Sequence, residues 1–162
     1  MIDAHLHLDK YRKDKVADLI NEWQDHSISG VIAVSTNLQS CYETLEWQVQ
    51  FPDFVYPCIG WHPEQRLPCD KELLELIQLI HSEKDRIVGI GEIGLPHYSL
   101  GEHDSPPLEP YIEVLSVLLR EAKAVNLPVA LHAVHDKAAK VFELLQCETV
   151  RKAHFHWLKA DN

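Results

Sequence analysis

The sequence predicts an α/β fold of the TIM type, an incomplete (β/α) barrel with about six of its eight βα units. Strand and helix patterns alternate along the whole chain, which is typical of a parallel sheet. Histidines and one glutamate recur where the successive strands end. The chain has 162 residues, whereas a closed barrel typically has about 250.

Composition and charge describe one globular domain that spans residues 1–162. Hydrophobic residues make up 46% of the chain and charged residues 25%, as in ordinary proteins with a substantial core. The net charge of −10 argues against a broad basic nucleic-acid surface, although bound divalent cations can attract a phosphate substrate locally. No signal peptide and no apolar run of roughly 18 residues is present, so no membrane contact is expected. The four cysteines form no CxxC pair, which favours reduced thiols in a cytoplasmic protein.

The first half of the chain is predicted to contain three strands and three helices in alternation. Short apolar runs predict strands at residues 2–8, 31–35 and 55–59. Apolar residues at helical spacing predict helices at residues 15–26, 38–51 and 70–82. Asn37 is placed to cap the second of these helices, and Pro52 stops it.

The second half continues the alternation around one long connection. A short buried strand is predicted at 87–90, and residues 91–107 after it are rich in Gly, Pro, His and Ser. This connection lies where barrels carry active-site loops, so we expect it to be functional or mobile. Pro110 suits the first turn of the next helix, and Asp136 can cap the last one. The remaining elements are predicted at residues 110–126 (helix), 129–132 (strand), 136 to about 145 (helix) and 153–157 (strand).

An open doubly wound sheet is the alternative architecture for this alternation. Its dinucleotide-binding form has a glycine-rich turn directly after the first strand. Residues 7–13 contain no glycine, so the barrel is favoured while the alternative stays open.

Side chains at the predicted strand ends form the candidate site. His5 and His7 lie two residues apart, so on a strand they share a face and can chelate one cation when neutral. Glu92 follows the fourth strand, and its two carboxylate oxygens can bridge two cations. His132 and His156 end the fifth and sixth strands. Because parallel strands end at one face of a barrel, we expect these five residues to meet there.

The individual signals also have structural explanations. A histidine pair at a strand end is weak evidence alone, because such residues are often exposed or bonded to backbone. For His62 we weigh substrate binding equally against a rigid, exposed turn. His81 near a helix C-terminus fits the helix dipole and receives no catalytic role. His97 and His103, in the long connection, are either substrate contacts or solvated.

In combination, four motifs identify a family resemblance. They are Asp3-Ala-His5-Leu-His7-Leu-Asp9, Gly60-Trp-His62-Pro63, Gly91-Glu92-Ile-Gly-Leu95 and Leu127-Pro-Val-Ala-Leu-His132. With them the sequence resembles the TatD family of metal-dependent hydrolases. The resemblance implies two divalent cations, Zn, Mg or Mn, with His5 and His7 on one, Glu92 bridging, and His132 and His156 on the other. It also implies hydrolysis of phosphoesters, in DNA or a small substrate.

The chain departs from the family pattern at several positions. Pro96 stands where the family commonly has Asp, and of the family's H-C-F-S-G only His156 is kept. The sequence stops before the region where the family has a further Asp ligand for the first cation. We therefore expect the last barrel units to be absent and the second cation to bind more tightly.

Three functions are compatible with these residues. The leading one is a deoxyribonuclease-like hydrolase in which Glu92 is catalytic and His62 contacts the substrate. The second is an amide or lactone hydrolase that uses the same ligands. The third is a catalytically silent barrel fragment that binds metal or a partner chain. Open first and sixth strands would favour a homo-oligomer in any of these cases.

Overall fold

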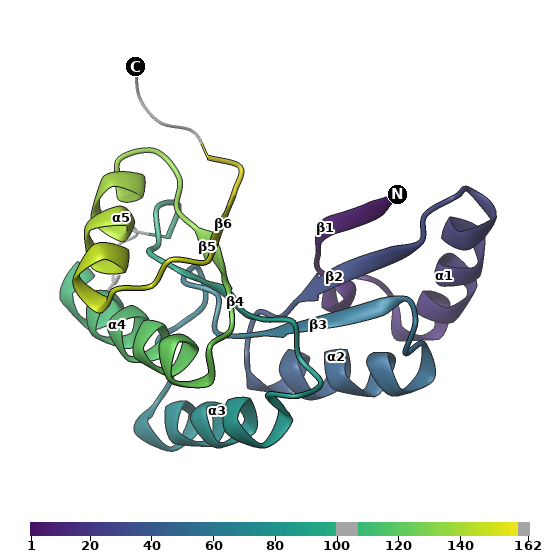
Figure 1. Cartoon of the computed structure of the whole chain (residues 1–162), viewed down its shortest axis with the longest axis horizontal. Helices are drawn as coiled ribbons and strands as arrows, with labels where there is room; N and C mark the ends of the chain where they lie inside the picture. The colour runs from purple at the N-terminus through teal and green to yellow at the C-terminus, as the bar shows by residue number, and fades with distance from the viewer. Residues whose placement is uncertain (100–106, 159–162) are drawn as a thin grey trace.

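The computed structural model of the chain describes residues 1–99 and 107–158 (Figure 1). Six parallel strands form one sheet in the order of the chain, without a reversal. A doubly wound sheet reverses its order, so that alternative is wrong and the predicted incomplete barrel is confirmed. The strands are β1 (Ile2–Leu6), β2 (Gly30–Val34), β3 (Val55–Ile59), β4 (Gly89–Gly94), β5 (Val129–His132) and β6 (Ala153–His156).

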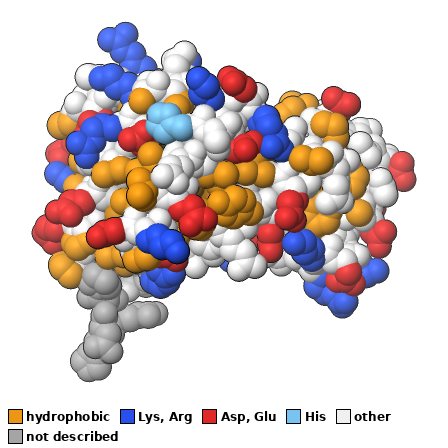
Figure 2. All heavy atoms as spheres, turned by 90° about the horizontal axis from the view of Figure 1, so that it is seen from below, with side chains coloured by type: hydrophobic (Ala, Val, Ile, Leu, Met, Phe, Trp, Pro, Cys, Tyr) orange, Lys and Arg blue, Asp and Glu red, His pale blue; other side chains and the backbone are white. Residues whose placement is uncertain are grey.

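Helices follow one another around the outside of this curved sheet (Figure 1). Asn37 caps the second helix as expected, because its Oδ1 accepts the backbone N–H of Ser40 at 3.0 Å. The face seen from below carries acidic and basic side chains interspersed, without one large basic area (Figure 2). The helices are α1 (Val16–Asp25), α2 (Leu38–Gln50), α3 (Asp70–Glu83), α4 (Leu108–Val125) and α5 (Lys137–Glu148).

The main core lies between the sheet and the helices. Ile59, Ile90 and Leu131, from β3, β4 and β5, are fully buried there. The apolar face of α4 packs on them and includes buried Leu115 and Leu119. Burial of such stripes against a parallel sheet is the main stabilising force of this architecture.

β1 ends two residues earlier than the sequence predicts. Its last residue is Leu6, and a short 3₁₀ turn follows from Leu8 to Lys10. The backbone N–H of Lys10 donates to the carbonyl of His7 at 3.2 Å, and that of Tyr11 donates to Leu8 at 3.1 Å. His7 therefore lies just beyond the strand rather than on it.

β4 is longer than predicted and contains Glu92 instead of preceding it. A Cβ on Gly60 would lie 2.7 Å from the Gly91 backbone, and one on Gly91 would lie 2.7 Å from the Ala130 side chain. The glycines thus allow three neighbouring strands to pack closely. The sequence pattern alone resembles a turn, which explains the early end predicted at residue 90.

Asp136 precedes α5 as predicted, but it does not cap the helix. Its side chain accepts no capping hydrogen bond from a backbone N–H of the first turn. The carboxylate instead pairs with Lys137 and with Nδ1 of His97, the latter at 3.1 Å. The cap prediction is therefore wrong, because the neighbouring Lys137 and the distant His97 engage this carboxylate instead.

The two outer strands face each other across the open side of the sheet (Figure 1). Within the described parts of the chain, β1 pairs only with β2 and β6 only with β5. A cavity of about 740 Å³ lies between β1 and β6. Separately, no described helix is long and apolar enough to cross a membrane. The residues lining the cavity include Asp3, His5, His7, Tyr11, His154 and Trp157.

The cysteines provide a test of this fold. Burial raises the pKa of the Cys41 thiol to about 12 and that of Cys58 well above its usual value, whereas Cys69 and Cys147 are exposed. Because thiolates are the reactive form, we expect the two exposed thiols, Cys69 and Cys147, to react rapidly with a thiol reagent at pH 8. All four should react in denaturant. Four rapid reactions in the folded protein would contradict the structure.

Candidate metal centre

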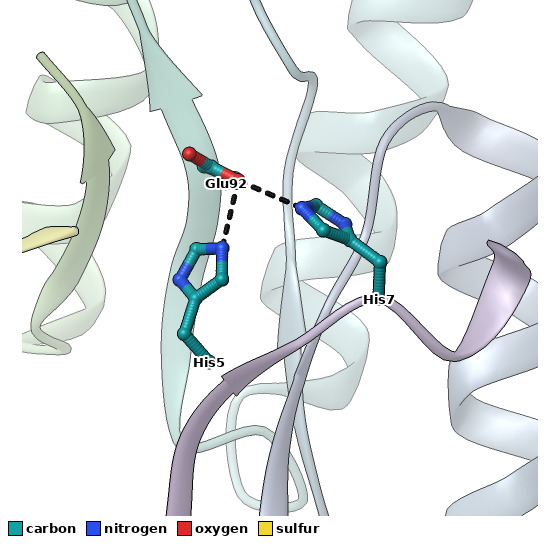
Figure 3. Close-up of side chains that lie close together, drawn as sticks. All are labelled: His5, His7 and Glu92. Atoms are coloured by element: carbon teal, nitrogen blue, oxygen red, sulfur yellow. Dashed lines mark hydrogen bonds and ion pairs between the residues drawn. The ribbon is translucent and has the colours of Figure 1, made fainter. Parts of the chain in front are cut away.

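The carboxylate of Glu92 is the centre of the candidate site, and its side chain is only 1% exposed. Oε2 lies 2.9 Å from Nε2 of His5 and 3.1 Å from Nε2 of His7 (Figure 3). The same oxygen lies 3.4 Å from Nε2 of His62. Oε1 lies 3.1 Å from Nδ1 of His132. Four imidazoles thus converge on one buried carboxylate.

Strand ends bring these side chains together. His5 lies on β1, His62 follows β3, and His132 is the last residue of β5. In the register of the sheet, Gly94 of β4 is aligned with His132, and His132 with His156 of β6. The carboxyl ends of parallel strands therefore meet at one face, as barrel sites require.

Glu92 is ionised in this environment. Burial alone would raise the pKa of the carboxyl group, but hydrogen bonds with the four histidines hold it well below its usual range. Burial likewise disfavours a charged His132, yet hydrogen bonds to Glu64 and Glu92 raise its pKa to about 9. Either protons on the imidazoles or a bound cation must therefore balance the negative charge of Glu92.

The residues fit divalent metal ions. Two groups each bring three ligand atoms within 4.8 Å of one another, and Glu92 belongs to both. Nδ1 of His5 and Nδ1 of His7 are buried without a hydrogen-bond partner, and Nε2 of each ring faces Glu92. Imidazole nitrogen and carboxylate oxygen suit Zn and Mn. The groups are His5, His7 and Glu92, and His62, Glu92 and His132.

His156 lies beside this centre but belongs to neither group. Its ring stacks on that of His5, with centroids 3.5 Å apart and planes inclined by 7°. Burial and the neighbouring His5 lower its pKa to about 4, so the ring is neutral at pH 7, as a metal ligand must be. Its role as a ligand stays a prediction.

His62 also faces the centre, and its role as a substrate contact stays a prediction. Its Nδ1 accepts the backbone N–H of Glu64 at 3.1 Å, so in the neutral ring the proton is on Nε2, facing Glu92. In this tautomer His62 offers Glu92 a donor rather than a lone pair. The group that contains His62 therefore offers a cation fewer free lone pairs than the group of His5 and His7.

Glu64 is a site residue that the sequence pattern does not predict. One of its carboxylate oxygens lies 3.2 Å from Nε2 of His132, on the far side of the ring from Glu92. The sequence feature that could have pointed to Glu64 is its position two residues after His62, in Trp61-His-Pro-Glu64.

The other histidines lie elsewhere. His81 pairs with Glu121 on α4 at 2.7 Å, which agrees with the surface role predicted for it. His97 contacts Asp136 rather than Glu92. His103 and much of the long connection, residues 100–106, lie outside the described residues.

Comparison with known proteins assigns the family. A family model described as TatD related DNase matches residues 2–162. The chain belongs to the TatD family. A Haemophilus influenzae relative, called an uncharacterized metal-dependent hydrolase, is 41% identical over 99% of this chain and 63% of its own length. The human protein named deoxyribonuclease TATDN3 is 27% identical over 96% of this chain and 60% of its own length.

Solved structures agree with the fold of this TatD-family chain. The crystal structure of YjjV, a TatD homologue from Escherichia coli, superposes with a TM-score of 0.86 at 23% identity. It covers 99% of this chain, which corresponds to 61% of YjjV. The chain thus spans about 60% of the length of the Haemophilus influenzae and human relatives.

We expect the protein to bind divalent metal through Glu92. After dialysis against Zn or Mn, elemental analysis should find about one equivalent or more per chain. Glu92→Gln should weaken binding by at least roughly 10-fold, because the amide loses the negative charge. The matched control His81→Ala removes an imidazole outside the site and should bind as the parent does. Equal binding by all three proteins would show that metal binds elsewhere.

Proposed function

We propose that this TatD-family protein is a hydrolase of phosphoester bonds that uses two divalent cations, Zn, Mg or Mn. The observation that carries the proposal is the buried, ionised Glu92, whose two oxygens face different histidines. A shared carboxylate of this kind can hold two cations side by side. The substrate is DNA or a small phosphoester, and the name of the human relative supports this class.

The proposed ligand assignment follows the strand ends. His5 and His7 hold one cation, and Glu92 contacts both. His132 and His156 hold the other, His156 being neutral and directly against His5. The free state predicted for the cysteines supports a cytoplasmic location, which we also propose.

The chemistry requires water activation and stabilisation of negative charge. Two bound cations lower the pKa of water and stabilise charge on phosphoryl oxygens. The chain supplies the ionised Glu92 that fixes the ligands, and we assign His62, beside Glu92, as a contact for the anionic substrate. The cavity between β1 and β6 reaches His5 and His7 from outside and provides a route for the substrate.

Activity of Glu92 variants tests the proposal. With a bis-aryl phosphodiester or single-stranded DNA, Glu92→Ala should lower kcat/KM by at least roughly 10³-fold, about 4 kcal/mol, because both cations lose a ligand. Glu92→Gln, which keeps the shape of the side chain, should show a similar loss. His81→Ala should change little. Equal losses in Glu92→Ala and His81→Ala, with folding intact, would refute the site, and faster turnover of a lactone or cyclic amide would refute the substrate class.

The open strand edges support a further part of the proposal, self-association of this chain. β1 and β6 each have one strand neighbour among the described residues, so their outer backbone groups are available for pairing. Sedimentation at micromolar concentration should show dimers or larger species that dissociate on dilution. A monodisperse monomer across this range would contradict the proposal.

A further inference from the structure

One carboxylate outside the proposed ligand set holds together three separate segments of the site. One oxygen of Glu64, Oε1, accepts the backbone N–H groups of His97 at 2.7 Å and Tyr98 at 3.0 Å. The same oxygen lies 3.2 Å from Nε2 of His132. The other oxygen accepts the backbone N–H of Ser99 at 2.8 Å. The side chain is 16% exposed, so water competes little for these donors.

We propose that Glu64 is a positioning residue that orients the ring of His132 and holds the segment 97–99, after β4, against it. An ionised carboxylate only accepts hydrogen bonds, so Nε2 of His132 keeps its proton in both the neutral and the charged ring. Nδ1 is then the nitrogen directed at Glu92, 3.1 Å away. Outer carboxylates that fix a histidine in this way also increase its strength as a ligand.

The segment 97–99 depends on the same carboxylate. Three successive backbone N–H groups outside a helix or strand point to one side and surround Glu64 as a backbone nest surrounds an anion. His97 also binds Asp136, at the start of α5, through Nδ1 at 3.1 Å. The loops after β3, β4 and β5 therefore form one network, with Glu64 at its centre.

The positioning role of Glu64 does not depend on the proposed hydrolysis, because its hydrogen bonds to His132 and to residues 97–99 involve neither a substrate nor a cation. Only a carboxylate satisfies all four donors. A glutamine offers one oxygen, and its NH₂ group would face another donor. Alanine offers no acceptor and leaves the four donors to water.

Amide hydrogen exchange measured by NMR tests the inference directly. In Glu64→Ala, exchange at residues 97–99 should accelerate at least roughly 10-fold, while the amides of α3 and β5 keep their rates. The Nε2–H signal of His132 should lose its protection from solvent. Glu64→Gln should be intermediate. The matched control Glu75→Ala removes a carboxylate on α3 that accepts the Tyr42 hydroxyl, and should change none of these signals.

Metal titration with Zn alone provides the functional readout. Glu64→Ala should weaken binding by roughly 10- to 100-fold without a change in global unfolding, and Glu64→Gln should restore part of the loss. Unchanged exchange at 97–99 in Glu64→Ala would overturn the proposal, as would unprotected 97–99 amides in the parent protein. If the parent hydrolyses no phosphoester but these signals respond, the proposed function fails and the role of Glu64 stands.

Discussion

The structure depends on the burial of one negative charge, that of Glu92. An ionised carboxylate with a 1% exposed side chain is unstable unless other groups replace its water. Here four imidazoles do so, and the residues that carry them are far apart along the chain, His5 lying 87 residues from Glu92. The sheet brings β1, β3 and β5 together around β4, so the apolar packing that stabilises the architecture also supplies the partners that the buried charge requires.

Close strand packing makes that convergence possible. Gly91 sits directly before Glu92, where a Cβ would collide with Ala130 of β5. Gly94 lies even closer to β5, since a Cβ there would be 1.9 Å from the carbonyl oxygen of His132. Larger residues at either position would push β4 away from β5 and separate Glu92 from His132. The two glycines thus keep β4 close to β5, and this strand spacing sets the distance between Glu92 and His132.

The ring of His132 links the buried Glu92 to Glu64, the outer carboxylate. Glu92 lies at one nitrogen of the ring and Glu64 at the other, and the two carboxylates together raise its pKa although burial opposes this. Glu64 in turn binds the segment after β4. Glu92, the histidines around it and this outer carboxylate form one layered site, and the cavity between β1 and β6 reaches its His5 and His7 side.

The sequence by itself determined the alternation of strands and helices and the parallel sheet, because apolar periodicity is a local pattern. It also predicted a candidate set at the strand ends, which comprises His5, His7, Glu92, His132 and His156. Tertiary structure alone decided that β4 continues through Glu92, since its glycines are explained by packing against β3 and β5. It also decided that His156 stacks on His5 and that Glu64 binds His132, 68 residues away. An acidic residue in a loop follows no period, so its partner is defined only when the strands around it have assembled.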